Sequence, residues 1–209
     1  IIGHADLALD DPNLSPKVRE QLEVIAGAGE RMQKLISEIL ATSRGVFRET
    51  SSPVAADASR IIASSLASFR PAAAARRVSV VDDLPESAEV GGDAFRLRQA
   101  FDNILSNAIK YTPAGGTIRI SGEVSEEDVI LNFADTGIGI PPDDLERVFD
   151  PYFRAQSVRE SPTPGTGLGM GIIRSIVEDQ GGSLFLESEL GAGTTVTVIL
   201  PARAEAGAA

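Results

Sequence analysis

Residues 135–140 read Asp-Thr-Gly-Ile-Gly-Ile, and residues 165–171 read Gly-Thr-Gly-Leu-Gly-Met-Gly. Upstream of both glycine clusters, residues 103–111 read Asn-Ile-Leu-Ser-Asn-Ala-Ile-Lys-Tyr. Glycine lets a backbone approach a ligand closely and adopts positive φ without strain. One cluster alone would say little, but the three segments in this order indicate a pocket for ATP.

The composition limits the class of protein. With 209 residues the chain can form one large domain or two small ones. A formal net charge of −11 argues against nucleic acid as a partner, because phosphate backbones require dense Lys and Arg. The absence of cysteine excludes disulfides and a cysteine nucleophile. No apolar run reaches the roughly 20 residues of a membrane span, and no signal peptide is visible. We therefore expect a cytoplasmic fragment that itself makes no membrane contact, while a longer parent protein could carry an anchor upstream.

The first 45 residues predict a helical hairpin. Residues 1–10 have the pattern of a helix end, which Asp-Asp-Pro-Asn at 10–13 interrupts. Ser15 and Pro16 can start a second helix that continues to about Arg44. Its apolar residues recur at helical spacing, at Val18, Leu22, Ile25, Met32, Leu35, Ile36, Ile39 and Leu40. Such a stripe predicts a hairpin that pairs with a second hairpin in a homodimer, although it could instead pack on its own domain.

Residues 46–54 are expected to be a linker, and residues 55–201 a separate domain. Helices are expected over 55–75 and from an Asp93 cap to about 110. Strands are expected at 78–81, 117–124, 129–133, 184–187 and 194–200. Because helices and strands mix without strict alternation, the predicted fold class is α+β rather than a doubly wound sheet. The small, polar residues 202–209 are expected to form a flexible tail.

The asparagine-rich segment places polar side chains on one face of a helix. Asn103, Asn107 and Lys110 are spaced by four and three, so they share a face, and the apolar residues fall largely on the other. An asparagine carbonyl is a suitable oxygen ligand for a magnesium ion that bridges phosphates, and Lys110 adds a charge for those phosphates. Taken alone, the same face could simply be solvated.

Asp135 stands at the end of an apolar strand, just before Gly137 and Gly139. A carboxylate in this position can accept a hydrogen bond from the exocyclic amine of adenine, while the glycines let the base lie against the backbone. A simple Asp-Thr-Gly turn would give the same pattern.

The second glycine cluster follows a polar stretch, residues 154–164, which we interpret as a mobile lid over the nucleotide. The cluster leads into an apolar helix that starts near Ile172, and a glycine-rich turn entering a helix offers N–H groups to phosphates. It is not a Walker A motif, because no Gly-Lys-Ser/Thr follows, and it is not a Rossmann fingerprint, because no strand precedes it.

Together these motifs resemble the catalytic module of bacterial sensor histidine kinases. Residues 103–111 resemble the N box of that family, and residues 135–139 its first glycine box. Residues 148–153, Val-Phe-Asp-Pro-Tyr-Phe, resemble its F box, residues 165–169 its second glycine box, and residues 191–194 its closing glycine turn. The hairpin at 1–45 is similar to the family's dimerisation and phosphoacceptor domain, on fewer residues.

The resemblance implies an α/β sandwich of the histidine kinase and gyrase type that binds Mg-ATP, with Asp135 on adenine and Asn107 on magnesium. It implies transfer of the γ-phosphoryl group to a histidine and then to an aspartate in the receiver domain of a response regulator. The implied ATP-binding residues are Asn103, Asn107, Lys110, Tyr111, Asp135, Gly137, Gly139, Ile140, Arg154, Gly165, Thr166, Gly167, Leu168, Gly169 and Thr194.

Two other functions stay open at this point. One is a catalytically silent, kinase-like dimeric adaptor or phosphotransfer protein, which would not need an intact pocket. The other is a stand-alone ATPase or serine kinase of the same fold. In the related gyrase, mismatch-repair and chaperone ATPases, a glutamate one turn before the magnesium asparagine activates water. Here Asn103 holds that position and cannot act as a base.

His4 is the only histidine in the chain, yet it is a poor candidate for the phosphoacceptor. In the family that it resembles, the acceptor is followed directly by Asp or Glu and precedes an Ile-x-Gly on the same helix. His4 is followed by Ala5 and comes after Gly3. In that pattern the acceptor lies about three turns before the Ile-x-Gly, so we expect it about nine residues before Ile1.

Overall fold

The structure is a computed structural model that describes residues 18, 21–22, 24, 55–155 and 166–203. The chain divides into two units, residues 1–48 and 49–209. In the first unit the described residues are Val18, Gln21, Leu22 and Val24, and all four are helical. The rest of the predicted hairpin, the predicted linker and His4 lie outside the described residues, so the hairpin stays a prediction.

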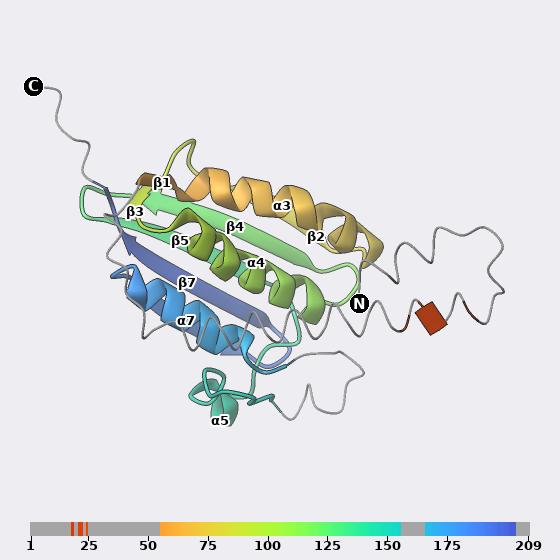
Figure 1. The fold of residues 1–209 in the computed structure, drawn as a ribbon. Coiled ribbons are helices and arrows are strands. Elements are labelled where there is room, and N and C mark those ends of the chain that lie inside the picture. The colour runs from red at the N-terminus through yellow and green to blue at the C-terminus, as the bar shows by residue number, and fades with distance from the viewer. Residues whose placement is uncertain (1–17, 19–20, 23, 25–54, 156–165, 204–209) are drawn as a thin grey trace, which may run out of the picture. The chain divides into compact units, whose positions relative to one another are not determined.

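The second unit is built on a five-stranded sheet with the strand order β2-β4-β5-β7-β6 (Figure 1). Strand β2 (Ser79–Asp83) runs parallel to β4 (Thr117–Val124), and all other neighbours are antiparallel. The remaining strands of this sheet are β5 (Asp128–Asp135), β6 (Ser183–Glu189) and β7 (Gly193–Pro201). A separate antiparallel pair joins β1 (Ala55–Asp57) to β3 (Glu89–Gly91).

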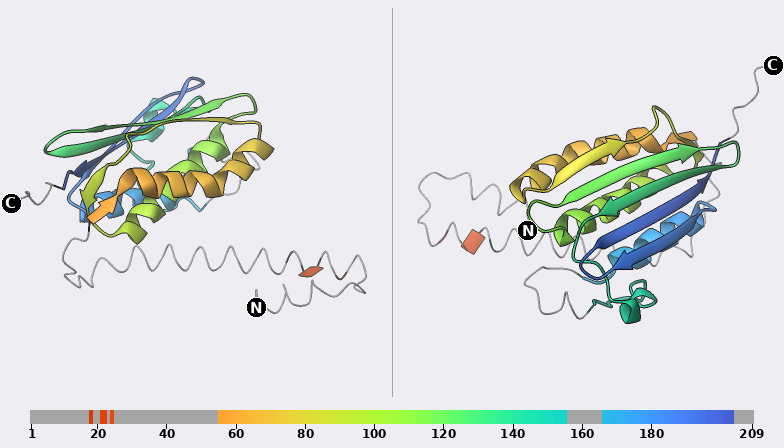
Figure 2. Two further views of the ribbon diagram at one scale, coloured as in Figure 1. Left: turned by 90° about the horizontal axis from the view of Figure 1, so that it is seen from above. Right: turned by 180° about the vertical axis from the view of Figure 1, so that it is seen from behind.

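Three helices cover one face of this sheet, so the unit has two layers (Figure 2). They are α3 (Ala58–Ala75), α4 (Ala94–Tyr111) and α7 (Gly169–Asp179). A short helix, α5 (Pro142–Leu145), follows the first glycine cluster. The predicted α+β class and the expected sandwich are confirmed.

The core lies between the sheet and the helices. Along β5, Val129, Leu131 and Phe133 are buried in alternation with half-buried residues, as the two-residue period of a strand requires. Helix α4 buries its apolar stripe, and the rings of Phe101 and Phe133 lie with centroids 5.8 Å apart. This contact fixes α4, which carries the asparagines, on β5, which carries Asp135.

The predicted α4 is confirmed at both ends, and its start has the predicted cap. The Asp93 carboxylate accepts hydrogen bonds from the backbone N–H groups of Phe95, at 2.8 Å, and Arg96, at 3.2 Å. This satisfies two donors that every helix leaves unpaired at its N-terminus.

The prediction of a helix over 55–75 is wrong for its first three residues. They form β1, and Asp57 instead caps α3 by accepting a hydrogen bond from the backbone N–H of Arg60 at 3.3 Å. Strand β3 was not predicted, since three residues are too few to show a period. Pairing also continues past residue 201: the backbone N–H of Ala202 donates to Glu127 at 2.8 Å, and that of Arg203 donates to Glu89 at 3.0 Å.

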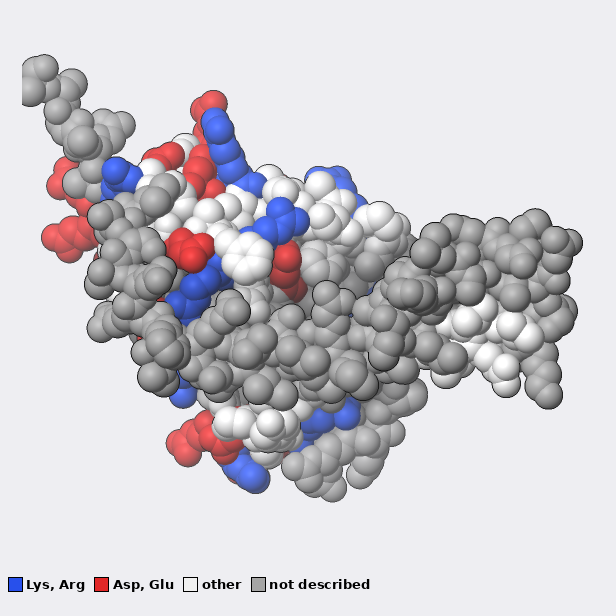
Figure 3. Space-filling model, in the orientation of Figure 1, with Lys and Arg blue, Asp and Glu red and all other residues white. Residues whose placement is uncertain are grey.

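The described surface carries charges of both signs. On the face shown in Figure 3, Lys and Arg lie among Asp and Glu rather than in a separate basic patch. None of the described helices is both long enough and apolar enough to cross a membrane.

Candidate nucleotide-binding site

Asp135, the last residue of β5, is held by the backbone at one carboxylate oxygen. Its Oδ1 accepts hydrogen bonds from the N–H of Gly137 at 2.8 Å and the N–H of Thr194 at 3.3 Å. Its Oδ2 accepts none from the residues that the structure describes. Burial raises the pKa of Asp135, and the two hydrogen bonds lower it in part. The arrangement leaves one oriented, partly desolvated oxygen for a donor on a ligand.

The polar face of α4 is arranged as the spacing predicts. Asn103, Asn107, Lys110 and Tyr111 are half-buried, while the apolar stripe of the helix is buried. The side-chain amide of Asn107 donates to Sδ of Met170 at 3.8 Å, and a Cβ at Gly169 would lie 3.7 Å from the same nitrogen. The start of α7 therefore lies against Asn107. The Oδ1 of Asn107 accepts no hydrogen bond from the described residues.

The hydroxyl of Tyr111 contacts one cationic side chain, Lys110, and is influenced by the charge of a second, Arg154. Lys110 Nζ donates to that oxygen at 2.8 Å and lies 4.6 Å from the ring centroid. Burial raises the pKa of the Tyr111 phenol, and the charge of Arg154 lowers it in part. The phenol is thus neutral near pH 7 and lies within the field of both cations. The Tyr111 carbonyl also accepts a hydrogen bond from Ile138 N–H at 3.2 Å, which ties the end of α4 to the first glycine cluster.

Two glycines allow the strands and loops of the site to approach this closely. Gly139 has φ of +67° and Gly193 has φ of +126°, both in the region that other residues rarely adopt. A Cβ at Gly139 would overlap the carbonyl oxygen of Glu189, and a Cβ at Gly193 would overlap the carbonyl oxygen of Asp135. Glycine is therefore required at both positions.

The second glycine cluster opens α7 as predicted. Gly167 has φ of +75°, and its carbonyl accepts a hydrogen bond from Tyr152 N–H at 3.0 Å. The Thr166 hydroxyl accepts one from Leu168 N–H at 3.4 Å. Among the described residues, no side chain caps the N-terminus of α7, so its first N–H groups can meet an anion. Gly165 and residues 156–164 of the predicted lid (154–164) lie outside the described residues.

Two arginines contact the segment 148–153, Arg174 of α7 and Arg147, which directly precedes the segment. The Arg174 guanidinium lies 3.6 Å from the ring centroid of Phe149, and that of Arg147 lies 4.4 Å from the ring centroid of Phe153. Such stacking of a cation on an aromatic face fixes a segment that has little regular structure of its own. Arg147 and Arg174 were not singled out in the sequence, where nothing marks them as partners of these rings.

The structure brings most of the predicted site residues together. Asp135, Gly137, Ile138, Thr194 and the end of α4 are linked by the hydrogen bonds above, and Asn107 lies beside Gly169. Sequence reasoning missed Met170 and Ser188. The Ser188 hydroxyl accepts a hydrogen bond from the N–H of Ile140 at 2.9 Å, which no local motif could have indicated. The ligand-binding roles of all these residues stay predictions.

Among the described residues, no group of three or more His, Cys, Asp or Glu side chains could hold a metal ion. Magnesium is usually held by one or two protein oxygens together with substrate phosphates and water. The Oδ1 of Asn107, which accepts no hydrogen bond from the described residues, could be such a protein oxygen. The described residues do not form a site of several carboxylates or histidines that would hold a metal without the nucleotide.

Comparison with known proteins gives a consistent result. The profile of the family described as "Histidine kinase-, DNA gyrase B-, and HSP90-like ATPase" matches residues 92–204. The chain is 34% identical over 203 residues to the sensor-like histidine kinase SenX3 of Mycolicibacterium smegmatis, covering 96% of this chain and 52% of SenX3. It is 40% identical over 133 residues to the sensor histidine kinase WalK of Bacillus subtilis, covering 62% of this chain and 22% of WalK.

Among solved structures, the mycobacterial sensor histidine kinase MprB aligns with a TM-score of 0.66 at 29% identity, covering 73% of this chain and all of that chain. The resemblance found in the motifs is confirmed by these relatives. The chain spans about half the length of SenX3 and less of WalK.

Proposed function

The chain belongs to the family of histidine kinase-, DNA gyrase B-, and HSP90-like ATPases, and we propose that it is the catalytic part of a sensor histidine kinase. The main support is the Asp135 carboxylate, whose Oδ1 is fixed by two backbone amides and whose Oδ2 accepts no hydrogen bond from the described residues. An oriented acceptor at the end of a strand, beside glycines that let a flat ring approach, suits the 6-amino group of adenine.

The remaining site residues surround the rest of the nucleotide in this proposal. Lys110 and Arg154 supply positive charge, and the open N-terminus of α7 supplies N–H donors for phosphate oxygens. Oδ1 of Asn107 would hold Mg²⁺, which would supply charge neutralisation at the phosphates. Tyr111, half-buried and neutral, would lie near the base or the ribose.

The reaction transfers the γ-phosphoryl group from ATP to a histidine. The bond between the γ-phosphorus and the oxygen bridging to the β-phosphate breaks, a bond between that phosphorus and an imidazole nitrogen forms, and ADP leaves. The chain contributes positioning and charge stabilisation rather than covalent chemistry. Asn103 cannot deprotonate water, so the phosphoryl group is conserved for the histidine instead of being hydrolysed.

The whole protein would act in two-component signalling. The hairpin at 1–45 would form the homodimer, the acceptor would be a histidine other than His4, and an aspartate of a response regulator receiver domain would take the phosphoryl group. We place this activity in the cytoplasm. The silent-adaptor alternative is disfavoured, because the site keeps an organised carboxylate that an adaptor does not need.

Calorimetry tests the nucleotide step, and labelling tests the transfer. The chain should bind ATP and its non-hydrolysable analogue, with magnesium increasing the affinity. In the full-length protein, radiolabelled ATP should give an acid-labile phosphohistidine that persists in His4→Ala. The absence of any heat with either nucleotide would refute the proposal, and loss of label in His4→Ala would identify His4 as the acceptor.

A further inference from the structure

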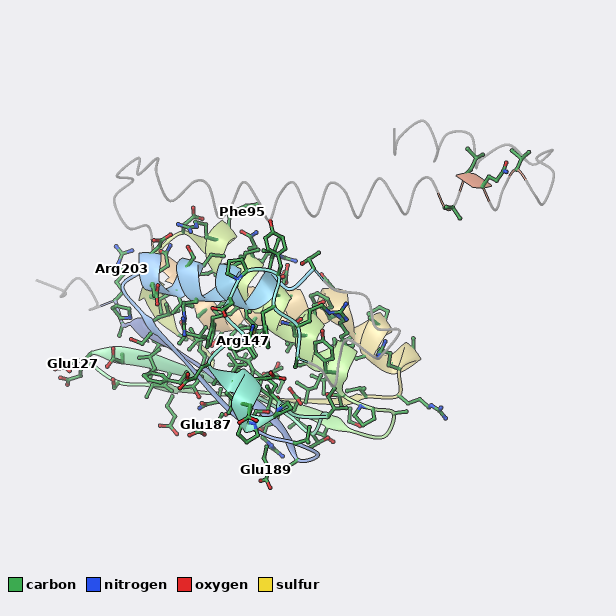
Figure 4. The ribbon with its side chains drawn as sticks, turned by 90° about the horizontal axis from the view of Figure 1, so that it is seen from below. Phe95, Glu127, Arg147, Glu187, Glu189 and Arg203 are labelled. Atoms are coloured by element: carbon green, nitrogen blue, oxygen red, sulfur yellow. The ribbon has the colours of Figure 1, made fainter. Side chains whose placement is uncertain are left out.

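Ser188 lies on β6 next to the strand that completes the site, and no motif in the sequence marks it. Its neighbours Glu187 and Glu189 are exposed, and both lie at the side of the sheet away from the helices (Figure 4). Because side chains alternate along a strand, half-buried Ser188 faces the helix side, where the nucleotide site lies.

The sheet register places Ser188 in one row with two residues of the site. Thr194 of β7 pairs with Asp135 of β5 on one side and with Ser188 of β6 on the other. Residues that pair directly across neighbouring strands point to the same face of the sheet. Asp135, Thr194 and Ser188 therefore form a row across three strands, at the edge where the glycine clusters meet.

The hydroxyl of Ser188 uses its full hydrogen-bonding capacity in this row. It accepts from the N–H of Ile140 at 2.9 Å, and it lies 2.8 Å from the Gly193 carbonyl and 2.8 Å from the Thr194 hydroxyl. A hydroxyl has one proton and two lone pairs. Donation to Gly193, with acceptance from Ile140 and Thr194, satisfies all three contacts at once.

These bonds close the far end of the loop that starts at Asp135. The loop is fixed at its beginning by the hydrogen bond from Gly137 to the Asp135 carboxylate, and at its end by the bond from Ile140 to Ser188. Between them, Gly191 N–H donates to the Ile138 carbonyl at 2.8 Å. Ser188 also contacts Thr194, whose own N–H binds the Asp135 carboxylate.

We propose that Ser188 is a positioning residue for base recognition, which keeps the Asp135 carboxylate aimed at the 6-amino group of a purine nucleotide. This inference rests on the proposed function. Without the Ser188 hydroxyl, Ile140 and Thr194 lose a shared partner, and the loop and the hairpin that hold the carboxylate can move apart. The loss of binding affinity therefore comes from contacts to the 6-amino group more than from contacts to the phosphates.

The experiment compares two nucleotides in wild type, Ser188→Ala, Ser188→Thr and the control Ser183→Ala. Ser183 lies on the same strand, is exposed, and makes no side-chain hydrogen bond to the described residues. Calorimetry measures the affinities for ATP and for purine riboside triphosphate, which lacks the 6-amino group. Amide hydrogen exchange of Ile140 in the nucleotide-free protein reports on the bond itself.

Ser188→Ala should weaken ATP binding by about fivefold to tenfold, as expected for one net hydrogen bond, and should reduce the preference for ATP over the analogue by a similar factor. Ile140 exchange should accelerate, Ser183→Ala should behave as wild type, and Ser188→Thr should restore the preference for ATP. An unchanged ATP preference in Ser188→Ala, or an equal loss of affinity for both nucleotides, would overturn the proposal even if the wild type binds ATP. Failure of the wild type to bind either nucleotide would instead refute the proposed function, and this inference with it.

Discussion

Replacing Asp135 by asparagine isolates the charge and the acceptor from the shape of the side chain. Oδ1 of Asp135 receives two backbone N–H donors, from Gly137 at 2.8 Å and Thr194 at 3.3 Å. In Asp135→Asn the amide oxygen must take this position, because only an oxygen can accept both bonds. The amide NH₂ is then forced to the place of Oδ2, where it faces the adenine amine as one donor facing another.

The expected loss follows from that substitution. A hydrogen bond to a charged group contributes about 1.5–3 kcal/mol net, which corresponds to roughly 10- to 150-fold in affinity. Folding stability should stay the same or rise, because burial raises the pKa of Asp135 and the asparagine removes that desolvated charge. Weaker ATP binding together with an unchanged or higher folding stability would distinguish a role of Asp135 in recognition from a role in the fold.

Titration calorimetry with ATP and thermal melting of the same samples measure both quantities. Asp128→Asn is the matched control, since Asp128 lies at the other end of β5 and its side chain makes no hydrogen bond to described residues. Purine riboside triphosphate should bind Asp135→Asn nearly as well as it binds the wild type, because it has no amine to lose. ATP affinity within about threefold of wild type would refute the adenine role, and a markedly lower melting temperature would show that the carboxylate serves the fold instead.

Three further predictions use the same assays. Burial raises the folded pKa of Asp135 above its ordinary value of 3.8. ATP affinity should therefore fall as the pH drops through that raised pKa, while protonation of the buried carboxylate stabilises the fold there. Neither effect should remain in Asp135→Asn. Asn107→Ala should remove most of the magnesium dependence of ATP binding. The control Asn132→Ala breaks the 2.8 Å hydrogen bond from Thr197 elsewhere on the sheet and should keep the magnesium dependence. Equal magnesium dependence in both variants would contradict the role of Asn107. Gly193→Ala should lower the free energy of unfolding, measured in urea, by about 3 kcal/mol or more, since its Cβ would overlap the Asp135 carbonyl. Gly191 has φ of +84° but no described atom within 4 Å of a Cβ, so Gly191→Ala should lower it by about 1–2 kcal/mol. Similar losses in the two variants would show that the hairpin can adjust.

The sequence predicts those parts of the structure that depend on local rules. Helix α4 was predicted to within a residue, because its cap at Asp93 and its apolar spacing are both local signals. Strand β3 was missed, because three residues carry no measurable period. The side chain of Asp57 was expected inside a helix, yet it caps one. Its strand β1 pairs with β3, where Asp57 lies opposite Glu89, and local sequence rules cannot detect a pairing over that separation.

The same distinction explains what was found and missed at the site. Asp135 was recognisable because its neighbours are glycines, and Asn107 because it recurs on a helical face with Asn103 and Lys110. Ser188 carries no such mark, because its role exists only through its pairing with Thr194. Glycines and helical spacing can be recognised in the sequence itself, whereas the partners of Ser188 can be recognised only once the register of the sheet is known.

Register is therefore the property on which the site depends most. A slip of β7 by one residue against β5 would place Gly193 or Thr195 opposite Asp135 and would turn every side chain of the strand to the other face. Val196, Val198 and Leu200 would then leave the core, so the hydrophobic pattern of β7 strongly disfavours the slip. The apolar core thereby fixes, at its end, the row in which Asp135 meets Thr194. The same β5–β7 register thus buries the apolar side chains of β7 and places Thr194 opposite Asp135, the geometry that would select the nucleotide.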